Sequence, residues 1–256
     1  MTAADGNRSA TALRALKVLE ILGNASEPVS VATVAQELGA DRSTAYRMLI
    51  TLMDAGYVIR DDRTRNYKLG YRLLSLSRSL LKGDERSELI LEAMREISAA
   101  TRETVHYAVL DGDASVLVLR VKGTQLVSVD FQIGDRSPLH CTSIGKVLLA
   151  YQDPRFVEEV IARGLPRVAP NTITDPEALR RALARARADG YAYDDLEFAD
   201  DMRCLAVPVF QSGGVVRGGI SLSGPASRYT PEKLDELRDV TVASTRRLSQ
   251  RLGGLA

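Results

Sequence analysis

Residues 30–53, SVATVAQELGADRSTAYRMLITLM, predict the fold of the N-terminal part of this chain. Ser30 is a helix-capping residue, and Gly39 can adopt the left-handed conformation that ends a helix. Asp41 can cap a second helix immediately afterwards. The apolar positions of both segments repeat at three- and four-residue steps, at Val31, Val34, Ala35 and Leu38 and then at Ala45, Met48, Leu49, Leu52 and Met53. Two amphipathic helices joined by a tight glycine turn are typical of a helix-turn-helix.

The second of these helices carries polar side chains on the face opposite its apolar stripe. Arginine, serine, threonine and tyrosine can donate hydrogen bonds to phosphates or to base edges. The first turns of a recognition helix enter the major groove of DNA, where free backbone N–H groups also favour phosphate. We therefore expect contacts with double-stranded operator DNA from Arg42, Ser43, Thr44, Tyr46 and Arg47.

The flanking segments predict a winged helix-turn-helix domain over residues 11–70. A helix is expected from residue 12, with Gly23 as its left-handed cap. Residues 56–60 and 67–70 read as two short strands around a polar turn, which holds Arg63 and Arg65 as further DNA contacts. Over residues 8–72 there are ten basic side chains against seven acidic ones. A solvated hairpin would show similar charges, but a hairpin that directly follows a helix-turn-helix favours DNA binding.

The composition restricts the class of protein. A chain of 256 residues is long enough for two domains, and its formal net charge of +1 means that any nucleic-acid surface must be local. No apolar stretch approaches the ~20 residues that span a bilayer, and the first residues lack a signal-peptide core. We expect a disordered tail over residues 1–10 and a cytoplasmic protein without membrane association. Cys141 and Cys204 form neither a disulfide framework nor a zinc site, so no metal or cofactor is expected.

A leucine stripe follows the winged domain. Leu73, Leu76 and Leu80 repeat at three- and four-residue steps in a segment otherwise rich in serine, arginine and lysine. Such a stripe must be buried against another surface. We expect a linker helix over residues 71–85 that pairs with its copy in a homodimer, because a helix-turn-helix needs two half-sites for useful specificity.

Residues 86–256 predict an α+β sensor domain. After a first helix, strands are expected at 105–110 and 115–121 around the turn Asp111-Gly112-Asp113, and further strands at 127–131, 204–210 and 215–223. Helices are expected to start at the cap and proline pairs Asp175-Pro176 and Thr230-Pro231. Strand hairpins mixed with helices are typical of this fold class.

Five motifs occur along the chain in a defined order. They are Ser43-Thr44-Ala45-Tyr46-Arg47 with Gly56-Tyr57; Pro138-Leu139-His140-Cys141-Thr142-Ser143-Ile144-Gly145-Lys146; Gly190-Tyr191-Ala192 with Asp194 and Glu197; Arg203-Cys204 with Ala206 and Pro208; and Ser221-Leu222-Ser223-Gly224-Pro225. In order and spacing they resemble the isocitrate-lyase-regulator (IclR) family of transcription factors over nearly the whole chain. The resemblance implies a GAF-like effector-binding domain, control of a catabolic operon and a dimer of dimers. It also implies ligand contacts from Asp194, Cys204, Ser221 and Ser223, with backbone donors from Ser143 and Ile144, and a further ligand contact from Gly145.

The residues themselves are compatible with such a pocket. A helix through residue 149 would begin at Thr142, Ser143, Ile144 and Gly145. Its first N–H groups would be unpaired, and the positive end of the helix dipole would favour an anion there. Ser221 and Ser223 alternate on a predicted strand, so both hydroxyls point to one face. Serines that bond to neighbouring backbone and a cysteine in the core would give the same pattern.

Several donors without a nearby Arg or Lys favour a small organic acid, either a hydroxy- or keto-acid or a short aromatic acid. With no tryptophan and four phenylalanines, the chain offers little aromatic surface for a large flat ligand.

A different class of protein is the alternative. His140 beside Cys141 suggests a cysteine-dependent acyl hydrolase with an accessory helical assembly domain. Adjacent side chains on an extended segment point apart, and the polar outward face of residues 42–51 favours the regulator over this enzyme.

Overall fold

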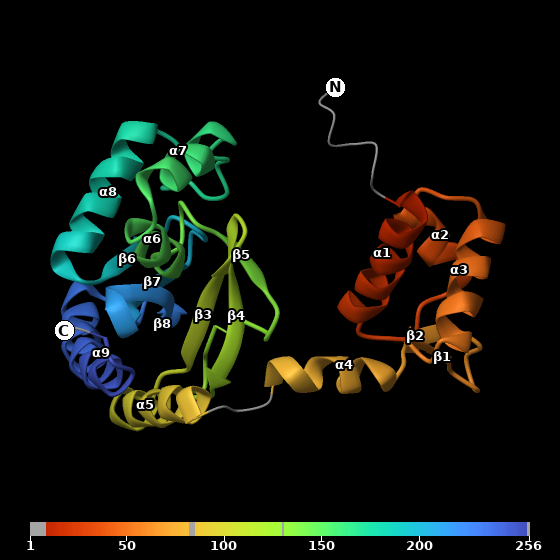
Figure 1. The fold of residues 1–256 in the computed structure, drawn as a ribbon, viewed down its shortest axis with the longest axis horizontal. Coiled ribbons are helices and arrows are strands. Elements are labelled where there is room, and N and C mark those ends of the chain that lie inside the picture. The colour runs from red at the N-terminus through yellow and green to blue at the C-terminus, as the bar shows by residue number, and fades with distance from the viewer. Residues whose placement is uncertain (1–8, 82–84, 130, 255–256) are drawn as a thin grey trace. The chain divides into compact units, whose positions relative to one another are not determined.

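The computed structural model describes residues 9–81, 85–129 and 131–254 of the chain (Figure 1). The chain divides into two compact units, Met1–Lys82 and Gly83–Ala256. The first unit combines helices with one short hairpin, and the second contains an antiparallel sheet with helices on both faces. The predicted α+β fold class is confirmed.

The N-terminal unit contains the predicted helix-turn-helix and wing. Ser30 caps the first of its two helices by accepting a hydrogen bond from the Thr33 N–H at 3.2 Å, and Gly39 ends that helix with φ 61°. The hairpin strands are antiparallel, with Arg60 opposite Tyr67. The elements are α1 (Ala10–Asn24), α2 (Val31–Leu38), α3 (Arg42–Asp54), β1 (Val58–Arg60) and β2 (Tyr67–Leu69).

Helix α1 differs from the prediction at both ends. It begins at Ala10 and is capped by Ser9, so Ala10 belongs to the helix and Ser9 directly precedes it. The rest of the expected tail, residues 1–8, lies outside the described residues. Gly23 does not cap the helix but lies inside it. The chain leaves the helix at Ala25 in an extended conformation because Val29 pairs with Tyr67, the Val29 N–H donating to the Tyr67 carbonyl at 2.7 Å.

One core holds this unit together. Val18 of α1, Val34 of α2, Leu49 of α3 and Val58 of β1 are completely buried, and Tyr67 of β2 is 1% exposed. Each element therefore contributes a buried apolar side chain, which is worth about 1.5–3 kcal/mol when removed from water. The wing is thereby packed against the three helices.

The segment after the wing forms helix α4 (Arg72–Leu81), and α5 (Glu85–Thr101) opens the second unit. The linker helix was expected over residues 71–85; α4 accounts for residues 72–81 of it, and residues 82–84 lie outside the described residues. Leu73 is half-buried, whereas Leu76 is 56% exposed. The side chain of Leu80 lies outside the described residues.

The second unit is built on a six-stranded sheet of order β5-β4-β3-β8-β7-β6, in which every neighbouring pair is antiparallel. The predicted hairpin around Asp111-Gly112-Asp113 and the two long C-terminal strands are confirmed. The strands are β3 (Val105–Asp111), β4 (Ala114–Val121), β5 (Arg136–Pro138), β6 (Ala192–Asp195), β7 (Met202–Gln211) and β8 (Val215–Pro225).

The strand expected at residues 127–131 is wrong. Of these residues, the described ones form no strand, and Val127 is 63% exposed. The edge of β4 pairs with β5 at Ala114–Val116, and at the next residue the Gly134 N–H donates to the Leu117 carbonyl at 2.8 Å. The apolar run is therefore a loop, held at the Val127 carbonyl by a hydrogen bond from the Arg228 guanidinium at 2.9 Å.

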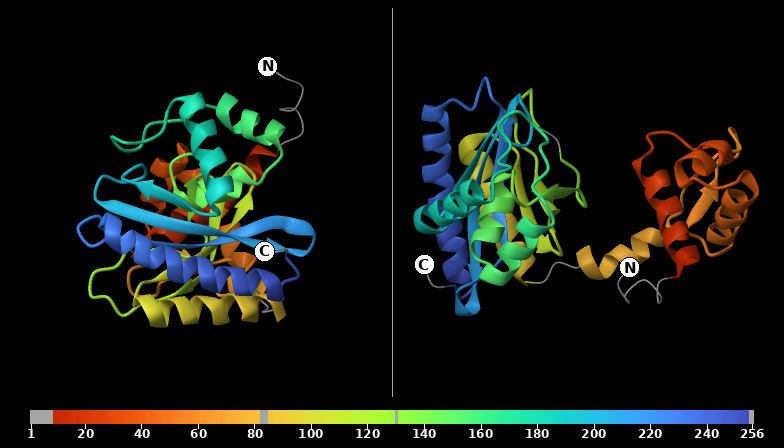
Figure 2. Two further views of the ribbon diagram at one scale, coloured as in Figure 1. Left: turned by 90° about the vertical axis from the view of Figure 1, so that its left-hand side faces the viewer. Right: turned by 90° about the horizontal axis from the view of Figure 1, so that it is seen from above.

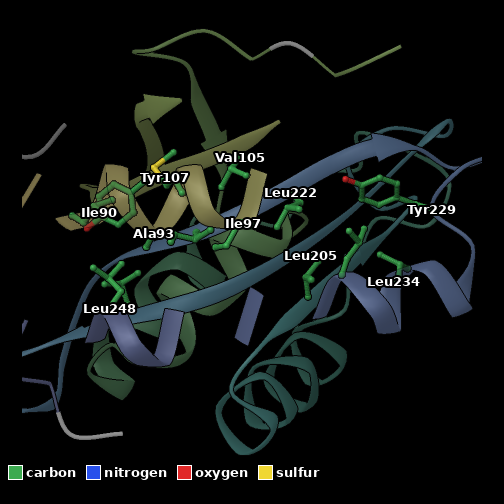
Figure 3. Close-up of a cluster of buried hydrophobic side chains, with 14 residues drawn as sticks. Ile90, Ala93, Ile97, Val105, Tyr107, Leu205, Leu222, Tyr229, Leu234 and Leu248 are labelled. Atoms are coloured by element: carbon green, nitrogen blue, oxygen red, sulfur yellow. The ribbon is translucent and has the colours of Figure 1, made fainter. Parts of the chain in front are cut away.

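Helices cover both faces of the sheet. Figure 2 shows α5 and α9 (Pro231–Arg251) side by side on one face. Their apolar side chains, including Ile97 and Leu234, pack on Val105, Leu205 and Leu222 of the strands (Figure 3). The other face is covered by α6 (Ser143–Ala150), α7 (Pro154–Ala162) and α8 (Pro176–Asp189). The predicted caps of α8 and α9, Asp175 and Thr230, are confirmed.

Candidate functional site

The first candidate surface is the outward face of α3. Asp41 caps the helix by accepting hydrogen bonds from the Ser43 hydroxyl at 2.6 Å, the Thr44 hydroxyl at 2.7 Å and the Thr44 N–H at 2.8 Å. The hydrogen bonds from the Ser43 and Thr44 side chains hold the pKa of Asp41 below its usual range. Both hydroxyls therefore donate to the cap. Arg42 and Arg47 are exposed and Tyr46 is 48% exposed, so these side chains remain available to a partner.

The wing presents the other two predicted DNA contacts. Asp61 closes its turn by accepting from the Thr64 N–H at 2.8 Å and the Thr64 hydroxyl at 2.9 Å. The Arg60 guanidinium donates to the Arg65 carbonyl at 2.8 Å, and Arg65 itself has φ 61°. These bonds shape the turn locally, while the side chains of Arg63 and Arg65 are exposed.

The second candidate site is a cavity of about 50 Å³ between the sheet and the N-terminal end of α6. The structure brings together six of the seven residues that were expected to contact a ligand. All six are buried, and they come from α6 and three adjacent strands. They are Ser143, Ile144, Asp194, Cys204, Ser221 and Ser223.

The alternation of side chains along each strand explains this convergence. Leu205, Ile220 and Leu222 point toward α5 and α9, so their neighbours in the chain point toward α6. Strand register then aligns these neighbours across the sheet. Asp194 lies opposite Cys204 and Cys204 opposite Ser223, which forms one polar row over β6, β7 and β8. Ser221 lies opposite His106, which extends the site to β3.

Gly145, the seventh residue, does not line the cavity. Its N–H donates to the Thr142 hydroxyl at 3.0 Å, and that hydroxyl donates to the Pro138 carbonyl at 2.8 Å. A Cβ atom at Gly145 would lie 2.5 Å from Cα of Leu139. The expectation of a ligand contact is therefore corrected: Gly145 allows the turn before α6 to pack closely. The N–H groups of Ser143 and Ile144, at the first turn of the helix, have no intrahelical acceptor.

The charged groups near the cavity include acids, the paired Lys146, and Arg120 of β4, whose guanidinium donates to the Phe131 carbonyl at 3.1 Å. Among the described lining residues there is neither Lys nor Arg. Asp194 is 0% exposed, and burial raises its pKa to about 7, with the Glu197 carboxylate adding to the increase. Lys146, on α6, has its ammonium in direct contact with Glu197 Oε1. The positive charge of Lys146 is therefore offset by its own partner.

The two cysteines are protonated thiols in this environment. Burial and the charge of Asp194 raise the pKa of Cys141 to about 12, and burial raises that of Cys204 well above its ordinary value. The imidazole of His140 donates to the Pro166 carbonyl at 2.9 Å. Because a thiolate is the nucleophile in cysteine catalysis, this arrangement does not support the acyl-hydrolase alternative.

Several lining residues were not among the predicted contacts. His106 and Ala108 lie two residues apart on β3, so both side chains point to the face of the sheet that carries the site. The alternation of the predicted strand could have indicated them. Phe131 and Phe198 come from loops, with ring centroids 6.3 Å apart, and Phe131 is 5.6 Å from the His106 ring. Half of the chain's four phenylalanines thus line one cavity, so the aromatic surface is larger than the composition indicated.

The described part of the chain contains no group of three or more His, Cys, Asp or Glu side chains arranged to hold a metal ion. None of its helices combines the length and the apolar character required to cross a membrane.

Comparison with known proteins identifies the family. The family described as the IclR helix-turn-helix domain matches residues 11–62, and that described as Bacterial transcriptional regulator IclR C-terminal matches residues 85–250. The chain is 34% identical to the HTH-type transcriptional regulator KdgR of Escherichia coli, covering 94% of this chain and 92% of that protein. It is 29% identical to the Transcriptional repressor IclR of Escherichia coli, covering 94% and 89%.

Solved structures agree with this result. The crystal structure of the Thermotoga maritima IclR matches with a TM-score of 0.77 and 30% identity, covering 95% of this chain and 98% of that chain. An IclR homolog from Microbacterium hydrocarbonoxydans, complexed with 4-hydroxybenzoate, matches with a TM-score of 0.77 and 28% identity, covering 94% and 100%. This chain belongs to the IclR family of DNA-binding bacterial transcriptional regulators, which are not enzymes.

Proposed function

We propose that this protein is a cytoplasmic regulator of a catabolic operon whose affinity for operator DNA is controlled by a small organic acid bound in the 50 Å³ cavity. The observation that supports the proposal most directly is the convergence of Ser143, Ile144, Asp194, Cys204, Ser221 and Ser223 on that one cavity. An acid bound there can alter DNA affinity only if it binds two arrangements of the protein unequally. A coupling of about 1–3 kcal/mol is typical of such systems.

The proposed effector is a hydroxy- or keto-acid of a few heavy atoms. A water molecule needs roughly 10–15 Å³ of such a volume, so a 50 Å³ cavity suits a ligand about the size of three to five waters. The ligand carboxylate would accept from the N–H groups of Ser143 and Ile144 and from the Ser221 and Ser223 hydroxyls. An aromatic acid, such as the 4-hydroxybenzoate of the Microbacterium homolog, would require the Phe131 and Phe198 side chains to move apart.

The proposed DNA contacts divide between α3 and the wing. Because the Ser43 and Thr44 hydroxyls donate to Asp41, we assign base reading chiefly to Tyr46 and Arg47, with Arg42 at the start of the helix. Ser43 and Thr44 can still accept hydrogen bonds from bases. Arg63 and Arg65 of the wing contact phosphates, which strengthens binding without regard to sequence.

Assembly as a homodimer, or as a dimer of dimers, completes the proposal. Leu76 on α4 is 56% exposed and Leu74 is 67% exposed, an apolar surface that a second copy of the helix would cover. A dimer with a twofold axis matches an operator of two half-sites.

Isothermal titration calorimetry with glycolate, lactate, pyruvate and 4-hydroxybenzoate tests the effector site. We expect one of the short acids to bind the wild type and the double variant Ser221→Ala, Ser223→Ala to bind it at least tenfold more weakly. Ser227→Ala is the control, because Ser227 is an exposed serine just after the same strand and outside the cavity. Equal affinity of the wild type and the double variant would show that the cavity is not the effector site.

A further inference from the structure

The two carboxyl oxygens of Asp194 have different surroundings. Oδ1 accepts hydrogen bonds from the backbone N–H groups of Glu197 at 2.8 Å and Phe198 at 3.3 Å. Oδ2 accepts none from any described N–H or O–H group, although the side chain is completely buried. A buried ionised carboxylate with an unpaired oxygen is costly, whereas the protonated acid offers a donor at the same atom.

The charged surroundings of Asp194 do not favour its ionised form. Among the described residues the adjacent cation is Lys146, and its ammonium contacts Oε1 of Glu197. Glu197 is itself an acid, and burial together with its charge raises the pKa of Asp194 to about 7. Several titratable and charged groups face this region. Those around Asp194 are Lys146 of α6, Cys141 just before α6, Glu197 just after β6 and Cys204 of β7. His106 and Asp135 also line the cavity, and Arg185 and Asp189 of α8 lie near the Lys146–Glu197 pair.

An acid bound in the cavity would bring a second carboxylate close to Asp194. No lysine or arginine among the described lining residues can separate the two charges. If both groups were ionised they would repel each other, and one of two adjacent carboxyl groups then retains a proton. Oδ2 of Asp194, which accepts no hydrogen bond from a described N–H or O–H group, can hold this proton and donate it toward an acceptor in the cavity.

We propose that Asp194 binds the effector as a neutral carboxylic acid, with Oδ2–H donating a hydrogen bond to the ligand carboxylate, so that effector binding takes up a proton. This inference rests on the proposed function of the cavity. No covalent bond forms or breaks in the ligand; one proton moves from solvent to Oδ2 of Asp194. The response of the regulator to its acid therefore weakens as the pH rises through neutrality.

Calorimetry of the full-length protein with pyruvate and lactate in buffers of different ionisation enthalpy measures this proton directly. For a group that titrates near 7 in the free protein, uptake is about 0.5 proton at pH 7 and about 0.9 at pH 8. By the same relation the dissociation constant rises about tenfold between pH 6 and pH 8. The proton count is obtained from the wild type alone, so it does not depend on the folding of a variant.

Variants then assign the proton to a residue. Asp194→Asn retains an N–H donor at the position of Oδ2 but cannot titrate, so its affinity should not change with pH. Asp195→Asn is the matched control, because Asp195 is the exposed next residue of the strand and pairs with Arg203 at 2.5 Å. This control should keep the pH dependence of the wild type. Loss of the pH dependence in Glu197→Gln but not in Asp194→Asn would overturn the assignment.

A measurement without ligand separates this inference from the proposed function. In ¹³C NMR of the free protein, one aspartate carboxyl should titrate near pH 7 and be missing from the Asp194→Asn spectrum. Binding of pyruvate or lactate without proton uptake at pH 7 and pH 8 would overturn the inference and leave the effector site intact. Failure of every acid in the calorimetric series to bind at pH 6 would overturn the proposed function and the proton linkage with it.

Discussion

Two glycines inside helices should respond in opposite ways to replacement by alanine. A Cβ at Gly145 in α6 would lie 2.5 Å from Cα of Leu139 and 2.6 Å from Oγ1 of Thr142. A Cβ at Gly23 in α1 would have Cδ1 of Leu69 as its nearest neighbour, at 3.5 Å. The contact with Leu139 involves a backbone atom that cannot rotate away, whereas the contact with the Leu69 side chain is an ordinary van der Waals contact. Gly145→Ala should therefore destabilise the protein, and Gly23→Ala should stabilise it.

The magnitudes follow from these distances. Carbon atoms pack best at ~3.5–4.0 Å, so the turn before α6 must move by about 1 Å in Gly145→Ala. Overpacking of this kind costs ~1–3 kcal/mol. Disturbing the hydrogen bond between Gly145 and Thr142, which caps α6, adds ~1 kcal/mol. Alanine in place of glycine in a helix returns only about 0.5–1 kcal/mol, which leaves a net loss of about 1–3 kcal/mol for Gly145→Ala and a gain of up to about 1 kcal/mol for Gly23→Ala.

Calorimetric unfolding of the full-length protein provides the assay. For a domain of this size, 1 kcal/mol changes the Tm by about 2–4 °C. Effector affinity measured in parallel should fall for Gly145→Ala, because the N–H groups of Ser143 and Ile144 move with the start of α6, and each 1.4 kcal/mol corresponds to about tenfold in affinity. Gly23→Ala should leave effector affinity unchanged. A Gly145→Ala protein with the wild-type Tm and the wild-type affinity would refute this reasoning.

Three further predictions concern DNA binding, assembly and pH. In a salt-controlled binding assay, Arg47→Ala should reduce specific operator affinity by about 1–3 kcal/mol, whereas Arg63→Ala should weaken binding to all sequences alike and flatten its salt dependence; no change in either variant would contradict the winged-helix surface. In sedimentation at micromolar concentration, the wild type should be a dimer or larger and Leu76→Asp should dissociate it, so a wild-type monomer would rule out pairing through α4. The pKa of Asp194 is higher in the folded protein than its ordinary value of 3.8, so the free energy of unfolding of the wild type falls as pH rises from about 4 to 7. Above pH 7 this contribution falls no further. In denaturant unfolding, the free energy of unfolding of Asp194→Asn should increase relative to that of the wild type over that interval. A difference between the two free energies that stays constant from pH 4 to 8 would contradict the raised pKa.

The errors of sequence analysis have a common origin. Gly23 has the residue type of a helix cap, but the end of α1 is set by the pairing of Val29 with Tyr67, far away in the chain. Val127 lies in an apolar run of the kind that forms strands, but β5 already occupies the edge of β4. Gly145 is in a ligand-binding motif, but the approach of Leu139 accounts for it. In the first two cases a contact between separate segments determined the outcome, and in the third it was the tight turn between Leu139 and Gly145.

Elements whose signals are local could be predicted from the amino-acid sequence. Caps at Ser30, Asp41, Asp175 and Thr230 depend on side chains that bond to N–H groups three residues away, so they can be read from neighbouring residues. The alternation along a strand is equally local, and it correctly predicted that the hydroxyls of residues 221 and 223 point to one face.

The packing of the folded chain sets which strand faces lie together, and this packing changes the chemistry of the side chains on them. The strand order β3-β8-β7-β6 brings His106, Ser221, Cys204 and Asp194 to one cavity, although long stretches of chain separate them. Two loops add Phe131 and Phe198, for which no local pattern gave a signal. The pKa of Asp194 depends on burial beneath these segments and on the charge of Glu197. Desolvation is a property of the surrounding fold, so a buried acid and an exposed one look the same in the sequence.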